Sequence, residues 1–192
     1  EGVENPFYQY ADLNSENGGV SFLWEKCYAF INNANLIIDG VGDSNPKAAA
    51  EARFFRAYAY NMLVTLWGDV PLLTSSIKVP SFNYTRTAVA EIDKVIADDL
   101  NYAVKELPDL ATASTPSRIN KDIARQLAAE AFLRIGMRDA SYFAQAETMA
   151  TAIINGGNYK LIEARYGKYL AEGGDYFRDM FRQGNMRRRQ GN

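Results

Sequence analysis

Apolar residues recur at helical spacing along most of the chain. Between residues 20 and 41 they fall every three or four positions, as at Leu23, Cys27, Ala34 and Ile38. Because residues three and four apart share one face of an α-helix, this spacing predicts an amphipathic helix. Equivalent patterns predict helices over residues 46–67, 87–106, 121–136 and 142–154, and a short helix over residues 176–181.

The predicted helix over residues 46–67 has the clearest ends. Asn45 is a favourable N-cap, and Pro46 suits the first helical position, where its missing N–H costs nothing. Gly68 can adopt the positive φ that ends a helix, and Pro71 prevents the helix from continuing. Both ends of this helix can therefore be predicted from a few adjacent residues.

Polar stretches without helical periodicity divide the chain into three segments. Residues 1–19 are expected to form an irregular N-terminal segment, residues 20–162 a helical region, and residues 163–192 a loop-rich tail. Within the helical region, the helix that follows Asn120 is expected to be closed by Gly136. The abrupt first and last residues indicate a piece of a longer protein.

Two of the predicted helices share a pattern. "ARFFRAYAY" begins at Ala52 and "ARQLAAEAF" begins at Ala124, and both read Ala-Arg-x-x-x-Ala-x-Ala-aromatic. Their separation is close to two units of the roughly 34-residue tetratricopeptide period, so the pattern predicts an all-α fold of stacked antiparallel helical hairpins. Alanines let neighbouring helices approach closely. The aromatic residues of the first copy are expected to fill the core between hairpins: Phe54, Phe55, Tyr58 and Tyr60.

Composition removes most catalytic chemistry. The chain has no histidine and one cysteine, Cys27, which excludes Ser-His-Asp triads and most zinc sites. We expect no cofactor and no metal; the expectation of no enzyme activity comes from the family resemblance described below. Adjacent Asp98 and Asp99 diverge by about 100° on a helix and are interpreted as a solvated face, as are Glu163 and Glu172. A net charge of −2 argues against nucleic-acid binding.

A run of motifs resembles one family. "AEARFFRAYAYNMLVTLWGDVPLL" resembles the signature of the SusD/RagB family, in which an alanine- and aromatic-rich helix ends in a Gly-Asp-Val-Pro-Leu turn. "WEKCYAFINNANLIID" resembles the helix that precedes the signature. "RTAVAEIDKVIADDLNYAVKELP", "SRINKDIARQLAAEAFLRIG" and "AETMATAIINGGNYKLI" resemble the segments that follow. Because the motifs occur in the family's order over residues 20–162, the set is more specific than any one of them.

The resemblance implies a function as well as a fold. Members of this family are nutrient-binding lipoproteins on the outer-membrane surface of Bacteroidetes. They hold an oligosaccharide or other nutrient above a TonB-dependent transporter and catalyse no reaction. Four tetratricopeptide-like hairpins and a less regular C-terminal half are implied for the full protein, with membrane contact only through a lipid anchor that this chain lacks.

The N-terminal segment holds the candidate ligand residues. Sugar recognition uses flat aromatic faces framed by side chains that bond hydroxyl groups. Residues of both kinds occur here outside any helical period, and the candidates are Tyr8, Tyr10, Asn14 and Asn17. The alternative is that Phe7 and Tyr8 only fix the segment against the helices. Trp24 and Trp67, at helical positions, are expected to pack rather than to bind ligand.

A second reading of the function stays open. Stacked hairpins also serve as protein–protein interaction scaffolds, which bind a peptide or protein in a groove between helices. The receptor reading places ligand contacts in loops, whereas the scaffold reading places them on helix faces. A hydrolase is the third and weakest reading.

Overall fold

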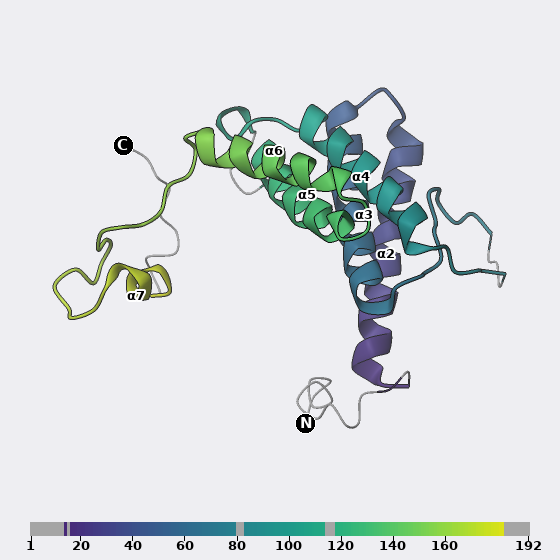
Figure 1. The fold of residues 1–192 in the computed structure, drawn as a ribbon, viewed down its shortest axis with the longest axis horizontal. Helices are drawn as coiled ribbons and strands as arrows, with labels where there is room; N and C mark the ends of the chain where they lie inside the picture. The colour runs from purple at the N-terminus through teal and green to yellow at the C-terminus, as the bar shows by residue number, and fades with distance from the viewer. Residues whose placement is uncertain (1–13, 15, 80–82, 114–117, 183–192) are drawn as a thin grey trace. The chain divides into compact units, whose positions relative to one another are not determined.

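α-Helices are the main regular structure of the described residues. A computed structural model describes residues 14, 16–79, 83–113 and 118–182. Within those residues one bridge, between Val70 and Thr87, is the only strand-like pairing, and the predicted all-α class is confirmed. The helices are labelled in Figure 1: α2 (Gly18–Val41), α3 (Pro46–Trp67), α4 (Val89–Glu106), α5 (Lys121–Gly136), α6 (Ser141–Asn155) and α7 (Tyr176–Met180).

Side-chain caps and glycines set the helix boundaries. Asn45 Oδ1 accepts a hydrogen bond from the N–H of Ala48 at 3.2 Å, and Asn120 begins α5 in the same way. Gly42 ends α2 with a φ of 48°, and Gly68 ends α3 with a φ of 70°. Because these signals are local, every predicted boundary lies within two residues of the observed one.

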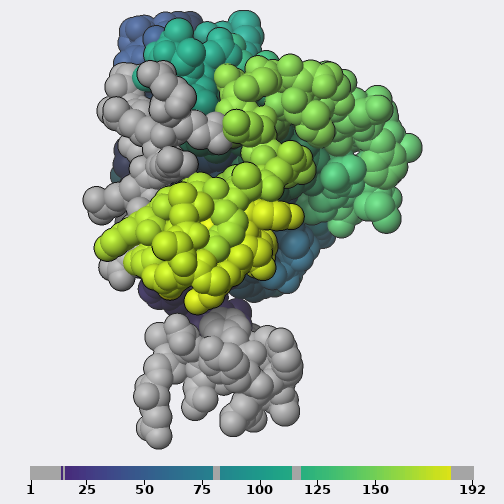
Figure 2. Space-filling model, turned by 90° about the vertical axis from the view of Figure 1, so that its left-hand side faces the viewer, coloured from purple at the N-terminus to yellow at the C-terminus, as the bar shows by residue number. Residues whose placement is uncertain are grey.

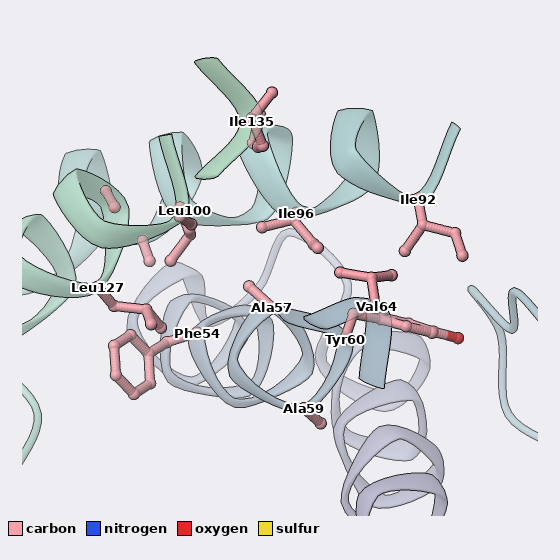
Figure 3. Packing of buried hydrophobic residues seen from close by; sticks show 14 of the residues in the cluster. Phe54, Ala57, Ala59, Tyr60, Val64, Ile92, Ile96, Leu100, Leu127 and Ile135 are labelled. Atoms are coloured by element: carbon pink, nitrogen blue, oxygen red, sulfur yellow. The ribbon is translucent and has the colours of Figure 1, made fainter. Parts of the chain in front are cut away.

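Successive helices pack against each other as hairpins. α2 contacts α3, α3 contacts α4, α4 contacts α5, and α5 contacts α6, while α3 also touches α5 (Figure 1). In the centre of the core, Ala57 and Val64 of α3 face Ile92 and Ile96 of α4 (Figure 3). Ala57, Ile92 and Ile96 are completely buried. The small alanine allows close contact, and the isoleucines fill the space around it.

The repeated sequence pattern marks equivalent buried positions. Tyr60 and Phe132, the aromatic residues that close the two copies, are both 0% exposed. The expectation that Phe55 and Tyr58 fill the core is wrong, because their side chains are 41% and 47% exposed. Both lie about 100° or more around α3 from Ala57, which faces α4. The alanines of both copies are buried as predicted: Ala52, Ala57, Ala59, Ala124, Ala129 and Ala131.

Gly136 ends α5 for a different reason from the predicted one. It does not belong to the glycines with positive φ. A Cβ atom at this position would lie 2.5 Å from Cε1 of Phe143 in α6. Gly136 therefore permits the close turn from α5 into α6. Both helices lie in the green part of the space-filling view (Figure 2).

The chain separates into two compact units, Glu1–Asn155 and Gly156–Asn192. The second unit is organised around Arg165, whose Nε and Nη2 donate to the carboxylate of Asp179 at 2.9 and 3.0 Å. Asp179 is fully buried, and Arg165 also donates to the carbonyl oxygen of Tyr169 at 2.8 Å. A buried ion pair thus holds this unit together. The division of the chain at residues 19 and 162 stays a prediction.

Candidate functional site

Two of the four predicted ligand residues lie at the start of α2. Asn17 Oδ1 accepts hydrogen bonds from the N–H groups of Gly19 and Val20 at 2.9 and 3.4 Å, so Asn17 is the N-cap of the helix. Asn14 precedes it in a turn, in which the N–H of Asn17 donates to the carbonyl oxygen of Asn14 at 3.1 Å. Tyr8 and Tyr10 lie outside the described residues. The ligand role of all four residues stays a prediction.

The Gly-Asp-Val-Pro turn joins the end of α3 to the start of α4. Asp69 Oδ1 accepts a hydrogen bond from the N–H of Val89 at 2.9 Å and so caps the first turn of α4. The N–H of Thr87 donates to the carbonyl oxygen of Val70 at 2.9 Å, and Val70 is completely buried. This turn therefore fixes the relative position of two helices.

Side chains of α2 hold the segment that follows the turn. Tyr28 Oη donates to the carbonyl oxygen of Pro71 at 2.8 Å. Asn35 Nδ2 donates to the carbonyl oxygens of Leu73 and Ser75, both at 3.0 Å. Further along, Asp39 accepts hydrogen bonds from Ser76, which hold the pKa of that carboxyl below its usual value. Side chains of α2 thus fix this segment through hydrogen bonds to its backbone.

A buried polar network lies beneath this segment. Arg56 donates to both carboxylate oxygens of Asp99, at 2.7 and 2.8 Å, and to Asn35 Oδ1 at 2.7 Å. It also donates to the carbonyl oxygen of Thr74 at 3.1 Å, and Arg53 adds a second cation 3.0 Å from Asp99. We call Arg56, Asp99 and Asn35 the Arg56 hub. It connects α2, α3 and α4 with the segment after α3.

The Arg56 hub corrects one interpretation made from the sequence. Asp99 was expected on a solvated face, but it is 1% exposed, because Arg53 and Arg56 compensate its charge. The signal was present in the pattern: Asp99 lies on the same helix face as Ile92, Ile96 and Ala103. A charged residue within an apolar stripe requires a buried partner.

Tyr60 completes the contacts of the segment. Its hydroxyl accepts a hydrogen bond from the N–H of Leu73 at 2.6 Å and donates to the carbonyl oxygen of the same residue at 3.1 Å. Burial raises the pKa of Tyr60 to about 12. The hydroxyl of Tyr60 therefore stays protonated at physiological pH, and it both donates and accepts a hydrogen bond.

The two carboxylate pairs considered from the sequence differ in their surroundings. Asp98 is exposed while Asp99 is neutralised by arginine, and Glu172 is paired with Arg182 at 2.6 Å. A group of three or more residues able to hold a metal ion does not occur in the described part of the chain. Among its helices, none has both the length and the apolar composition needed to cross a membrane.

The two tryptophans pack as expected. The rings of Trp24 and Trp67 meet edge to face, with centroids 5.4 Å apart, and Trp24 also contacts Tyr28 at 5.0 Å. Both tryptophans are partly buried against the core. They join the start of α2 to the end of α3.

An apolar surface lies elsewhere on these two helices. The rings of Phe30 and Phe55 stack across α2 and α3 with centroids 6.4 Å apart, and both are exposed. Tyr58 and Leu66 continue the row along α3, three and eleven residues after Phe55. We call Phe30, Phe55, Tyr58 and Leu66 the open face of α3. The sequence did not predict it.

A small hollow of about 240 Å³ lies beside the N-terminus of α3. Asn45, Thr112 and Ile119 contribute to its wall, together with Glu51 and Arg118. Arg118 Nε donates to Glu51 at 2.9 Å, and Lys47 is the third charged residue of the wall. Two of the three charges of the hollow are therefore paired with each other.

The helices and their connections define the class of the protein. It is an all-α protein of stacked tetratricopeptide-like hairpins, in which hydrogen bonds hold the Gly-Asp-Val-Pro turn between α3 and α4. Comparison with known proteins identifies the family. Residues 4–135 match the family model of SusD-like proteins described as starch-binding and associating with the outer membrane. The chain belongs to this SusD-like family.

One curated protein and two solved structures are also similar to this chain. SusD-like protein P2 of Formosa agariphila is 30% identical over 151 residues, which cover 74% of this chain and 28% of the relative. A SusD superfamily protein from Parabacteroides distasonis is 26% identical with a TM-score of 0.73, covering 82% of this chain and 36% of that chain. A protein crystallised with xylogluco-oligosaccharide is 25% identical with a TM-score of 0.68, covering 79% of this chain and 32% of that chain. The chain thus spans about a third of these relatives or less.

Proposed function

We propose that the whole protein binds an oligosaccharide or another nutrient at the cell surface and delivers it to a TonB-dependent outer-membrane transporter. The match of residues 4–135 to a starch-binding, outer-membrane-associated family is the observation that carries this proposal. The related structure with xylogluco-oligosaccharide supports a glycan as the ligand class. The protein binds its ligand without covalent chemistry.

The fold suits a receptor of this kind. The Arg56 hub and the Gly-Asp-Val-Pro turn hold α2, α3 and α4 in one arrangement, so loops at their ends have a rigid base. Asn14 and Asn17 stand at the start of α2, directly after the segment that contains Tyr8 and Tyr10. We place the ligand contacts in this segment, where aromatic faces and amide groups occur together.

The proposal includes a location and a partner. The full-length protein is held at the outer-membrane surface by a lipid anchor, and a SusC-like transporter is its partner. The family's description as associating with the outer membrane supports this location.

Two measurements test the proposed function. The complete protein is titrated calorimetrically with starch-derived and xyloglucan oligosaccharides, then with amino acids and short peptides. Separately, the tagged protein is isolated from solubilised outer membranes of its native host, and co-purifying proteins are identified. We expect saturable binding of one nutrient class and recovery of a TonB-dependent transporter. Absence of both results would rule the proposal out.

A protein-interaction scaffold is the alternative, and the open face of α3 favours it. Tyr58 and Leu66 are 47% and 58% exposed on a helix face, where a scaffold places its contacts. The two functions are separable: a scaffold would bind a protein or peptide through these residues, and substitutions at Tyr8 and Tyr10 would leave that binding unchanged.

A further inference from the structure

The two compact units of the chain carry opposite charge. Residues 156–192 contain eight lysines and arginines and four acidic residues, a net charge of +4. Residues 1–155 contain thirteen and nineteen, a net charge of −6. A positive unit attracts anions over roughly 8–10 Å at physiological ionic strength, the Debye length. An anionic ligand is therefore favoured by the second unit and disfavoured by the first.

Helix α7 places aromatic and cationic side chains in adjacent rows within the second unit. Phe177 and Phe181 are one turn apart, and their rings meet edge to face with centroids 5.1 Å apart. They are 62% and 67% exposed. Arg178 and Arg182 each follow a phenylalanine by one residue, which sets a cationic row about 100° around the helix. We call Phe177, Phe181 and Arg178 the α7 surface.

Arg178 supplies the available cation of this surface. Arg182 is already engaged, because it pairs with Glu172 at 2.6 Å and lies 3.9 Å from the ring centroid of Tyr169. Arg178 Nη1 donates to the carbonyl oxygen of Gly173 at 2.7 Å, and the described residues give its guanidinium group no carboxylate partner. A guanidinium group has five N–H donors, so most of those of Arg178 can bind a ligand.

The loop before α7 positions Arg178. Asp175 Oδ1 accepts a hydrogen bond from the backbone N–H of Arg178 at 2.7 Å and caps the helix. A Cβ atom at Gly174 would lie 3.1 Å from Cδ of Arg178, so the arginine side chain lies against the glycine backbone. The ion pair between Asp179 and Arg165 fixes α7 within the unit. Because the guanidinium group starts from a defined position, it loses less conformational freedom when it binds.

An acidic sugar uses both rows of the α7 surface. The apolar C–H face of a pyranose ring packs on an exposed aromatic face, and a carboxylate on that ring accepts two N–H groups of a guanidinium side by side. A neutral sugar would use only the aromatic row, and a phosphate group only the cationic row. The charge of the second unit favours the acidic sugar over the neutral one.

We propose that the α7 surface is a contact for an acidic oligosaccharide whose pyranose rings carry carboxylate groups. Phe177 and Phe181 hold the apolar face of one sugar ring, and Arg178 donates to its carboxylate. This inference rests on the proposed function and narrows its ligand from nutrients in general to uronic acid glycans. The contact is additional to the N-terminal segment.

Calorimetric titration of the complete protein with a short oligogalacturonide tests the inference. Xyloglucan oligosaccharide is the neutral comparison, and both are measured at low and moderate salt. We expect the oligogalacturonide to bind more tightly and to lose affinity as salt rises, because screening weakens the attraction of its carboxylates. A glutamate peptide of the same charge should bind more weakly, since it has no ring to pack on Phe177.

Substitutions locate the contact on α7. Arg178→Gln should weaken oligogalacturonide binding about two- to fivefold, the effect of one solvent-exposed ion pair, while Arg178→Lys should keep part of the affinity. Phe177→Ala should weaken it about two- to tenfold through loss of aromatic contact. Arg86→Gln and Tyr84→Ala are the controls, at exposed positions of the connection between α3 and α4, and should bind normally. The Tm of each variant shows whether the protein is still folded.

The other results contradict the inference in distinguishable ways. Equal affinities of Arg178→Gln and Arg86→Gln for oligogalacturonide place the acidic ligand elsewhere. Tighter binding of xyloglucan, or equal binding of the glutamate peptide, shows that the surface does not select an acidic sugar. Binding to anionic phospholipid vesicles in place of the saccharide assigns the surface to a membrane. Each of these overturns the inference alone, whereas absence of any bound nutrient and of a co-purifying transporter overturns the proposed function as well.

Discussion

At the scale of single residues, Arg56 has the strongest structural role. Its guanidinium group compensates Asp99 and bonds Asn35, and its side chain is 5% exposed. Arg56→Leu leaves a carboxylate and an amide oxygen buried with fewer partners. We expect the free energy of unfolding in urea to fall by about 3–5 kcal/mol.

An exposed ion pair is the control for Arg56. The side chains of Lys94 and Glu91 are 65% and 58% exposed, so Lys94→Ala should leave the free energy of unfolding nearly unchanged. If Arg56→Leu and Lys94→Ala cost the same, the buried network does not hold the helices together.

Tyr60 makes stability sensitive to alkaline pH. Its pKa is raised from 10.0 to about 12 by burial, so the folded chain keeps the phenol proton that the unfolded chain loses. The stabilising contribution is complete below pH 10 and is lost as the pH rises toward 12. Urea unfolding between pH 9 and pH 12, values chosen to span both pKa values, should show a shallower decline for Tyr60→Phe. Tyr84→Phe, at an exposed position, should keep the original slope; a matching slope for both variants contradicts the assignment.

At the scale of elements, the turn between α5 and α6 requires a residue without a side chain at position 136. Gly136→Ala brings a Cβ to 2.5 Å from Phe143, which must move. We expect a loss of roughly 1 kcal/mol in thermal or urea unfolding, the lower end of overpacking costs. Adding Phe143→Ala should restore much of the loss, since it removes the obstructing ring.

Gly40 is the matched control for Gly136. It lies within α2, and a Cβ there meets nothing within 4 Å. Gly40→Ala should therefore stabilise the protein by about 0.5–1 kcal/mol, the usual difference between the two residues in a helix. Destabilisation by both substitutions would show that Phe143 is not the cause.

The bounds of the helices were predicted better than the burial and the contacts of individual side chains. The bounds of α3 followed from Asn45, Pro46 and Gly68, because capping and positive φ are properties of a few adjacent residues. The burial of Asp99 was not predicted, because it depends on Arg56, which is 43 residues away in the sequence. Likewise, aromatic composition could not distinguish buried Tyr60 from exposed Tyr58, since that difference depends on which side of α3 faces α4.

The candidate site was predicted only in part. Asn17 was predicted as a ligand residue, and its capping of α2 was not predicted, although asparagine is favoured before a helix. The contacts that Asn35 and Asp39 make with the segment after α3 join residues about 40 positions apart, which no local pattern reveals. The family motifs predicted a nutrient ligand but carried no binding residue with them.

At the scale of the whole molecule, ligand binding should depend on the N-terminal segment. Tyr8→Ala and Tyr10→Ala in the complete protein remove the proposed aromatic faces, and each should weaken glycan affinity by about two- to tenfold, from ~0.5–1.5 kcal/mol of aromatic contact. Calorimetric titration measures the change. Tyr84→Ala, an exposed tyrosine on the connection between α3 and α4, should bind normally. Equal affinity of all three variants would place the ligand elsewhere.

The Arg56 hub also constrains the order in which a nascent chain can fold. Arg56 and Asn35 emerge during synthesis well before Asp99, so the hairpin of α2 and α3 first exists with a cation that has no carboxylate to meet it. Docking of that hairpin is unfavourable until α4 has been translated. The first three helices are therefore expected to assemble as one cooperative step rather than one hairpin at a time.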